Sequence, residues 1–261
     1  MKAARIREHG GPEVLTLEDV PEPRIRPDEI LLRVRACALN HLDLFVRAGI
    51  PGMQFPMPHI LGSDIAGEVV AVGELCQRVQ PGWRVLLSPG LSCRQCPQCL
   101  AGNDNLCRRY MLFGYGRDGG DCELVAAPEY SAIQIPGEMD FENAAAAPLV
   151  FLTAWHMLLT RAQLQPGEDV LVLAASSGVG SAAIQIARLF QCRVIATAGG
   201  DEKLARARDL GADHVIDTTA RTSPSRSARY PASAVWTSWW STWARRPGRT
   251  ACTRWRPRDA W

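Results

Sequence analysis

The chain has 261 residues, of which 47% are hydrophobic, and this is enough for a buried core in one or two domains. Its net charge of +2 is unevenly spread, because residues 219–261 hold nine of the 29 basic side chains and one of the 27 acids. The first 218 residues therefore carry 20 basic and 26 acidic groups, or −6, which argues against a nucleic-acid partner. The charged N-terminal stretch is not a signal peptide and no apolar run reaches membrane-spanning length, so we expect a cytoplasmic protein with no membrane partner.

Residues 1–135 read as short β-strands separated by turns. Three runs of aliphatic and β-branched residues, at 29–36, 65–73 and 83–87, are bounded by Pro or Gly. This part of the chain predicts an all-β domain, interrupted by a Cys-rich loop at 90–110.

The Cys-rich loop predicts a metal site. Its spacing is C-x2-C-x2-C-x7-C, formed by Cys93, Cys96, Cys99 and Cys107. Four thiolates can surround one tetrahedral zinc ion, and such a shell leaves no position open for water or substrate, so we predict one structural zinc ion. An iron–sulfur cluster fits less well, because its usual run continues with x3-C-Pro after the third cysteine. Metal-free thiols would be unusual in so polar a stretch, and two disulfides would require an oxidising compartment.

From residue 136 onward, strands alternate with helices. Residues 142–160 read as a helix rich in Ala and Leu, apart from Pro148. The segments that follow are strand 169–174, helix 178–190, strand 193–197, helix 201–210 and strand 214–217. The order β-α-β-α-β predicts a parallel sheet with helices on its faces, and hence an α/β fold with a doubly wound, Rossmann-type domain.

The turn after the first of these strands has the small residues that a dinucleotide-binding loop requires. It contains Ala175, Ser177, Gly178, Val179 and Gly180. Small residues let the backbone approach a pyrophosphate, and the amides at the start of the next helix face the anion. Because Ala and Ser replace the first two glycines of G-x-G-x-x-G, the alternative is an ordinary tight turn. The flanking β-α-β pattern favours the dinucleotide site.

The end of the second strand bears on the choice of dinucleotide. Sites for NAD usually carry an acid here, about 20 residues after the glycine-rich turn, which binds the ribose 2′-hydroxyl. This chain has Thr197 and Ala198 there, followed by two glycines, and Lys203 lies beyond. With no acid at that place to repel a 2′-phosphate, the sequence favours NADP(H) over NAD(H). The alternative is that Lys203 only lies on a solvated helix and that the site accepts both.

Several segments together resemble the medium-chain zinc-containing alcohol dehydrogenase and quinone oxidoreductase superfamily. They are residues 10–15, 38–44, 61–67 and 177–185, together with the four-cysteine loop. The resemblance covers residues 1 to about 218 and implies a GroES-like catalytic domain at 1–135 and the N-terminal half of a Rossmann domain at 136–218. It also implies hydride transfer between NAD(P)(H) and a small carbonyl, quinone or alcohol substrate, and a homodimer when the cofactor domain is complete.

The chain departs from this family where the resemblance places a catalytic zinc. Where the resemblance places the first Cys ligand, this chain has Asn40, and where it places a His-Glu pair, the chain has Ser63-Asp64. At the position of the second Cys it has Leu149 or a neighbour. One carboxylate is too few to hold a zinc ion with an open position. Without a catalytic zinc, the alkoxide formed from an alcohol substrate has no Lewis acid to stabilise it. Quinones and enones accept a hydride without such a Lewis acid, so we expect reduction of quinones or enones. A zinc alcohol dehydrogenase is the alternative within the same class.

Four residues are candidates for the catalytic site. The resemblance implies that Asn40 matches the asparagine of zinc-free quinone reductases and donates a hydrogen bond to the substrate carbonyl. It likewise implies that Thr153 lies near the nicotinamide. Asp43 and Asp64 are the next candidates, and bracing of loops is the alternative role for both.

The composition changes abruptly at residue 219. Residues 219–261 contain six of the eight Trp but no Leu, Ile, Met, Phe, Lys or Glu, and show no strand or helix period. Reading two nucleotides later converts each Trp codon to one for Leu, Val or Met, and residues 234–244 can then encode an apolar strand. We therefore hypothesise a frameshift, with a nucleic-acid- or membrane-binding arm as the alternative.

The frameshift hypothesis has a consequence for function. It leaves a half-sheet of three strands, without the second mononucleotide half of a Rossmann domain, and so predicts weak or absent activity. A second class of function is therefore a non-catalytic fragment that binds zinc, folded in residues 1–135 and otherwise loose.

Overall fold

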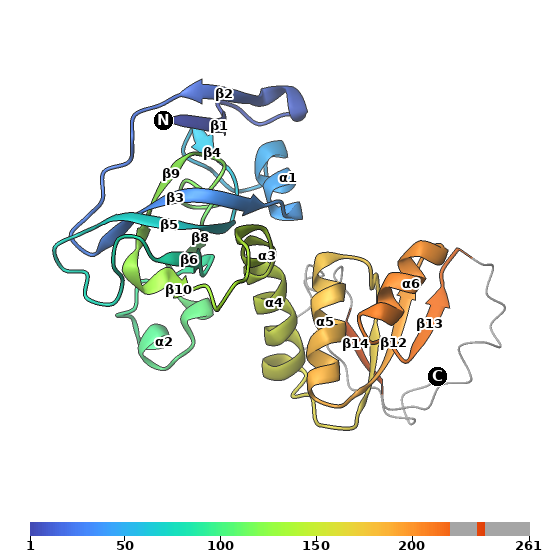
Figure 1. The fold of residues 1–261 in the computed structure, drawn as a ribbon. Helices are drawn as coiled ribbons and strands as arrows, with labels where there is room; N and C mark the ends of the chain where they lie inside the picture. Colours follow the sequence, from blue (N-terminus) through green and yellow to red (C-terminus); the bar gives the residue numbers. More distant parts are fainter. Residues whose placement is uncertain (220–233, 238–261) are drawn as a thin grey trace. The chain divides into compact units, whose positions relative to one another are not determined.

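The computed structural model describes residues 1–219 and 234–237, so the frameshift hypothesis concerns a segment that lies almost entirely outside the described residues. The chain divides into two compact units, Met1–Leu149 and Val150–Trp261 (Figure 1). Each unit has its own sheet and its own buried core. The α/β fold class is confirmed, with a β-rich first part and an alternating second part.

The first unit is built on an antiparallel sheet of five strands in the order β10-β6-β5-β3-β9. The strands are β3 (Glu29–Ala38), β5 (Asp64–Val72), β6 (Arg84–Leu87), β9 (Leu124–Pro128) and β10 (Ala132–Gln134). The three strands that the sequence predicts are therefore present. Ile30, Leu32, Ile65 and Val85 are each 0% exposed, so these strands supply the core of the unit.

A smaller antiparallel sheet holds the N-terminus of the chain. Its strands are β1 (Lys2–Ile6), β2 (Leu15–Asp19) and β4 (His59–Ile60), with β1 in the middle, and the short helix η1 (Pro12–Val14) precedes β2. Arg5 and Arg7 both donate to the Glu18 carboxylate, and these hydrogen bonds, first from Arg7 and then from Arg5, lower the pKa of Glu18 to about 2. The register of β1 places Ile6 opposite His59 and Arg5 opposite Ile60, so the chain that leads to Asp64 starts from this sheet.

The first unit also contains helices that the all-β expectation omits. Helix α1 (His41–Ala48) begins directly after Asn40, whose backbone N–H donates to the Asp43 carboxylate at 2.6 Å. This contact satisfies an amide at the helix start, and Gly49, with φ of 90°, ends the helix. The helix is short and is stabilised at its ends, so its residues carry no long apolar period that would reveal it.

The Cys-rich loop is more structured than a plain loop. It carries β7 (Gly90–Leu91), one turn of helix α2 (Pro97–Leu100), the short helix η2 (Asp104–Leu106) and β8 (Met111–Leu112). Strands β7 and β8 pair with each other, so they close the base of this lobe. A further short helix, η3 (Glu129–Ser131), joins β9 to β10.

A helical stretch with one break follows the first unit's sheet, as the sequence predicts. It consists of α3 (Phe141–Ala146), α4 (Pro148–Trp155) and the π-helical η4 (His156–Arg161). Phe141–Arg161 is the one stretch of the described residues that is long and apolar enough to cross a membrane, and core helices pass the same test. Ala154 and Leu158 are both 0% exposed and belong to the core of the second unit.

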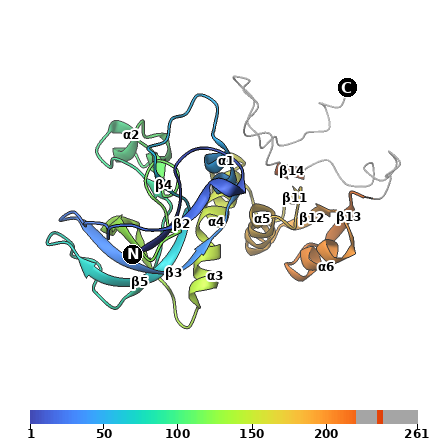
Figure 2. The ribbon, with the colours of Figure 1, turned by 90° about the horizontal axis from the view of Figure 1, so that it is seen from above.

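The second unit is a parallel sheet with helices, as expected. It contains β11 (Asp169–Val172), α5 (Gly178–Leu189), β12 (Arg193–Ala198), α6 (Asp201–Asp209) and β13 (His214–Asp217). Figure 2 shows these strands side by side with α5 and α6. The core joins Val170 and Val194 of the strands to Ala183 and Ile186 of α5.

The expectation of a three-stranded sheet is wrong. A fourth strand, β14 (Ala234–Thr237), pairs in parallel with β11, and the order across the sheet is β13-β12-β11-β14. Its sequence, Ala-Val-Trp-Thr, is short but consists mainly of residues that favour strands, and the open edge of β11 offers it a pairing partner. A run of four residues is too short to show a period, so the sequence pattern did not reveal it.

Candidate active site and metal centre

Asp43 ties together the two loops that carry the catalytic candidates of the first unit. One of its carboxylate oxygens accepts the backbone N–H of Asn40, and the other accepts the backbone N–H of Gly62 at 3.2 Å. The Asp43 side chain is 4% exposed, and this burial raises its pKa. Asp43 therefore holds the start of α1 against the chain that leads into β5.

Asn40 and Asp64 meet at this junction. The Asn40 side-chain amide donates to Asp64 Oδ2 at 2.9 Å, and Asp64 Oδ1 accepts the backbone N–H of Leu149 at 2.8 Å. Asp64 is 1% exposed, and burial raises its pKa to about 6, although both hydrogen bonds act in the opposite direction. The structure thus brings Asn40, Asp43 and Asp64 together, and their catalytic role stays a prediction.

Two further residues of this junction were not anticipated from the sequence. Burial raises the pKa of Asp121 and of the Cys37 thiol, and the nearby Asp43 carboxylate adds to both shifts. A Cβ atom at Gly62, whose φ is 94°, would lie 2.6 Å from both Asp121 Oδ1 and Cys37 Sγ, so only glycine fits between them. The pair of glycines before Asp121 is the one sequence signal that could have drawn attention to it.

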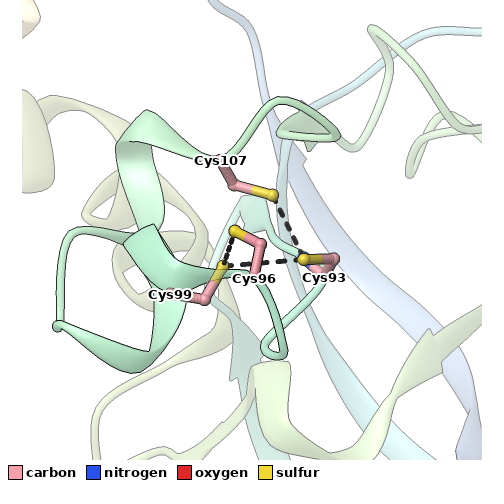
Figure 3. Close-up of side chains that lie close together, drawn as sticks. All are labelled: Cys93, Cys96, Cys99 and Cys107. Carbon is pink, nitrogen blue, oxygen red and sulfur yellow. Dashed lines mark hydrogen bonds between the residues drawn. The ribbon is translucent and has the colours of Figure 1, made fainter.

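The four predicted metal ligands converge in the lobe, as Figure 3 shows. Their sulfur atoms all lie within 4.8 Å of one another, and the Cys93–Cys99 and Cys96–Cys99 sulfur pairs are 3.8 and 3.5 Å apart. Zinc–sulfur bonds of ~2.3 Å in a tetrahedron place sulfurs about 3.8 Å apart. Among the described residues the eight cysteines are free, so these distances suit a shared cation and not a pair of disulfides.

The backbone of the lobe is arranged to support thiolates. The Cys107 sulfur accepts the backbone N–H groups of Cys93 at 3.5 Å and Arg109 at 3.3 Å. Hydrogen bonding from the backbone of Gln95 is the main factor that lowers the pKa of Cys93 to about 5. Outside the thiols, Arg94 lies 4.6 Å above the ring of Tyr130, whose hydroxyl donates to the Ser92 carbonyl, so the lobe is attached to the body of the unit.

The predicted dinucleotide turn leads from β11 into α5. Ser177 precedes the helix and its hydroxyl accepts the Gly180 N–H at 3.0 Å. A Cβ atom at Gly180 would lie 2.4 Å from the Ala174 carbonyl oxygen, so glycine is required for the close packing of helix on strand. Ser177 and Gly178 are exposed, Val179 is half-buried, and Ala175 is 0% exposed, so Ala175 lies beneath the turn.

The remaining cofactor candidates lie at the carboxyl end of β12. The Thr197 carbonyl accepts the Ala175 N–H at 2.9 Å, which links this end to the turn, and the Ala198 carbonyl accepts the Thr218 N–H. Thr197 and Ala198 are buried and Lys203 is exposed on α6. An acid that the sequence interpretation did not include, Asp217, accepts the Gly200 N–H at 3.4 Å.

Thr153, the last catalytic candidate, lies on α4 in the second unit and is half-buried. It therefore belongs to a different unit from the cluster of Asn40, Asp43 and Asp64. Its role near the nicotinamide stays a prediction.

Known proteins share both units. Residues 26–137 match the family model for the alcohol dehydrogenase GroES-like domain, and residues 178–230 match that for the zinc-binding dehydrogenases. A quinone oxidoreductase from Lama guanicoe is 34% identical over 218 residues, which are 83% of this chain and 58% of the relative. An alcohol dehydrogenase from Geobacillus stearothermophilus is 34% identical over 219 residues, 83% of this chain and 64% of the relative. A crystal structure described as an NAD-dependent alcohol dehydrogenase is 50% identical, with a TM-score of 0.84 over 87% of this chain and 66% of that one.

The β-rich unit, which contains the four-cysteine lobe, thus matches the alcohol dehydrogenase GroES-like domain, and the parallel-sheet unit, which contains the glycine-containing turn, matches the zinc-binding dehydrogenases. The chain belongs to the medium-chain alcohol dehydrogenase and quinone oxidoreductase superfamily, as its sequence motifs predict. It spans 58% to 64% of the length of the two curated relatives described above.

Proposed function

We propose that this chain carries the catalytic and first cofactor-binding parts of an NAD(P)(H)-dependent reductase of quinones or enones. The observation that supports it is the contact between Asn40 and Asp64. Where the family resemblance places ligands of a catalytic zinc, this chain has an amide donor fixed by a buried carboxylate. A conjugated carbonyl needs a hydrogen-bond donor at its oxygen, whereas an alcohol undergoing oxidation needs a Lewis acid.

Bound NAD(P)H supplies the hydride, and the residues of this chain bind and orient the acceptor. One N–H of the Asn40 amide donates to Asp64, and the amide nitrogen is 3.4 Å from the Ala38 carbonyl, a weak contact that a substrate oxygen can replace. Asp64 acts as a positioning residue, because its carboxylate sets the orientation of this amide. The reduced acceptor takes its proton from solvent, and we assign Thr153 to the neighbourhood of the nicotinamide.

The test measures the oxidation of NADH and NADPH with a benzoquinone and with an α,β-unsaturated ketone as acceptors. In the reverse direction, the reduction of NAD⁺ and NADP⁺ is measured with simple alcohols. We expect turnover with the quinone or the enone. Asn40→Ala should lower kcat/KM about 10- to 100-fold while nucleotide affinity is retained, since one donor to a developing oxyanion is removed. Oxidation of simple alcohols without enone reduction would contradict the proposal.

A zinc alcohol dehydrogenase is the second candidate. Two of the proteins compared above are described as alcohol dehydrogenases, at 34% and 50% identity. Such an enzyme would carry a catalytic zinc in addition to the zinc of the lobe. Metal analysis of the purified chain separates the candidates, because one zinc per chain supports the reductase and two support the alcohol dehydrogenase.

We propose that the lobe holds one structural zinc ion through Cys93, Cys96, Cys99 and Cys107. The convergence of four sulfurs and the N–H groups directed at Cys107 support this assignment. Four protein ligands close the shell, so the ion stabilises the fold of the lobe and takes no part in the chemistry.

We propose that the second unit binds the dinucleotide through the Ser177–Gly180 turn, which includes Gly178 and Val179. The small Ala175 lies beneath this turn, and Thr197 and Ala198 lie at the adenosine end. Lys203 and the absence of an acid at the end of β12 favour NADP(H). A protein that is 50% identical is nevertheless described as NAD-dependent. Binding measurements with NADH and NADPH separate the two nucleotides.

We propose that the catalytic domain consists of residues 1–135 and that the first half of the cofactor domain consists of residues 136–218. We further propose that a frameshift produced residues 219–261. The position of β14 supports the frameshift. Strand β14 lies in the segment whose shifted reading frame can encode an apolar strand, and it pairs with β11, where a Rossmann sheet has its fourth strand. One uninterrupted frame in independent genomic reads would contradict it. If both nucleotides fail to bind, the chain is instead the non-catalytic fragment. A cytoplasmic location and a homodimer of the complete protein stay proposals.

A further inference from the structure

Four carboxylates are buried among the residues that the structure describes, and only two of them are paired with a cation. The four belong to Glu29, Asp43, Asp64 and Asp169. Glu29 accepts a hydrogen bond from Arg117 at 2.8 Å. Asp169 accepts one from Arg193 at 2.7 Å. The other two, which belong to the candidate active site, form no ion pair with any basic side chain in the described part of the chain. Acids are rarely buried without a cation, and unpaired ones are typical of functional sites.

The two unpaired carboxylates accept hydrogen bonds from neutral groups only. Asp43 accepts the backbone N–H groups of Asn40 at 2.6 Å and Gly62 at 3.2 Å. Asp64 accepts the Asn40 side-chain amide at 2.9 Å and the Leu149 N–H at 2.8 Å. These donors hold the carboxylates in place without cancelling their charge. Because the pKa of Asp64 is about 6, its carboxylate is mainly ionised at neutral pH.

A third carboxylate adds to the negative charge of this junction. Asp121 is half-buried and interacts with the thiol of Cys37. Burial raises the pKa of that thiol, and the three carboxylates of the junction add to the shift, so Cys37 senses the charge of all three. The basic residue in the last turn of α1, Arg47, does not neutralise them by direct contact, since its Nε has no hydrogen-bond partner within the described residues.

The charge of the junction acts on whatever binds to Asn40. A carbonyl oxygen that accepts from the Asn40 amide lies one hydrogen bond away from the group that also donates to Asp64. The oxygen itself is uncharged and is not repelled. A carboxylate or sulfonate elsewhere on the same small molecule would lie roughly 8 Å from these acids, where like charges in a protein-like medium weaken binding on the order of tenfold or more.

We infer that Asp43 and Asp64 make the acceptor site at Asn40 selective for uncharged quinones and enones, against acceptors that carry a carboxylate or a sulfonate. This inference rests on the proposed function and names the substrate class of the same site. The selectivity comes from repulsion of the wrong substrate, in addition to the hydrogen bond that holds the right one.

The first test compares matched acceptors with the zinc-loaded full chain and NAD(P)H. One pair is an α,β-unsaturated keto acid and its methyl ester, and the other is a naphthoquinone sulfonate and the parent naphthoquinone. We expect kcat/KM for the uncharged member to be at least about tenfold higher. Asp64→Asn should reduce this preference roughly three- to tenfold, whatever its activity with the uncharged member, because intrinsic reactivities cancel in the ratio. The exposed control Glu74→Gln, in the same unit, should leave the preference unchanged.

The second test does not depend on turnover. The rates at which a cationic and an anionic methanethiosulfonate modify Cys37 are measured by mass spectrometry of the mapped peptide. The cationic reagent should react at least about tenfold faster, and Asp64→Asn should lower this ratio while Glu74→Gln should not.

Asp43→Asn replaces Asp64→Asn in both tests if the latter does not fold. Equal kcat/KM for charged and uncharged acceptors overturns the inference, as does a preference that folded Asp64→Asn and Asp43→Asn both retain in full. Absence of turnover with every acceptor refutes the proposed function, and the thiol rates then decide the inference by themselves. Equal rates of the two reagents would show that the junction carries no effective negative charge.

Discussion

Asn40 and Asp64 are 24 residues apart in the chain, yet the Asn40 amide donates to Asp64 Oδ2 at 2.9 Å. The contact joins the start of α1 to the start of β5, and Asp43 reinforces it through the N–H groups of Asn40 and Gly62. The carboxylates of Asp43 and Asp64 are both buried, so any negative charge on them is shielded from solvent. Its stability and its function should therefore respond to pH and to changes of charge.

The first prediction concerns Asp64 and the pH dependence of stability. Its pKa is about 6 in the folded chain, above the ordinary value of 3.8, so the folded state binds a proton more tightly than the unfolded state. The contribution of Asp64 to the free energy of unfolding should thus fall as pH rises from about 4 to 6, by about 2 to 3 kcal/mol. Urea unfolding of the chain and of Asp64→Asn across this range measures the effect.

Asp64→Asn should flatten the pH profile over that window, while the exposed control Glu74→Gln should leave it unchanged. Asp43 and Asp121, whose pKa values are also raised by burial, should leave a residual slope of the same sign. Identical profiles for the unaltered chain and Asp64→Asn would show that Asp64 does not retain its proton on folding.

The second prediction separates hydrogen bonding from charge at Asn40. Asn40→Asp places a second carboxylate within hydrogen-bonding distance of Asp64, and two like charges at this separation cannot both ionise readily. We expect this variant to lower quinone or enone reduction more than Asn40→Ala at neutral pH, with partial recovery at acidic pH, where the pair shares a proton. Activity profiles of both variants against pH provide the measurement. An Asn40→Asp profile parallel to that of Asn40→Ala would rule out this coupling.

The third prediction concerns the zinc lobe. Cys99 lies within 3.8 Å of the sulfurs of Cys93 and Cys96, so Cys99→Ser should lose the metal and loosen residues 90–110. Elemental analysis should fall from one zinc per chain to less than about half, with faster hydrogen exchange confined to the lobe. Nucleotide affinity should be unchanged, because the Ser177 turn lies in the other unit. One tightly bound zinc in Cys99→Ser would contradict a closed four-thiolate site.

The fourth prediction tests the turn between β11 and α5. In Gly180→Ala the new methyl group would meet the Ala174 carbonyl oxygen at 2.4 Å, which the backbone can relieve only by moving the helix away from the strand. We expect a loss of about 1 to 3 kcal/mol in stability and at least tenfold in nucleotide affinity. Gly178→Ala is the control for stability, because its new methyl group meets only the end of the Val150 side chain. Equal losses of stability in the two variants would argue against a special role for Gly180 in packing the helix on the strand.

Local sequence patterns were sufficient for the parts of this protein that depend on nearby residues. The cysteine spacing predicts a cluster because the short loop from Cys93 to Cys107 can bring all four sulfurs together without a distant partner. The strands and helices of the second unit follow from apolar runs whose period is set by the backbone itself. The capped helix α1 was missed, because its eight residues cover only about two turns and are too few to show a clear apolar period.

Contacts between distant residues were decided by the tertiary structure. Pairing of β3 with β5 brings Asn40 to Asp64, pairing of β12 with β13 brings Asp217 to Gly200, and the open edge of β11 accepts β14. Each depends on strand register, and a register is set by the packing of the whole sheet and not by the residues that it brings together. The chain's motifs therefore identify its superfamily, whereas the burial of Asp64 and the contact between Asp217 and Gly200 become visible only when the sheets have formed.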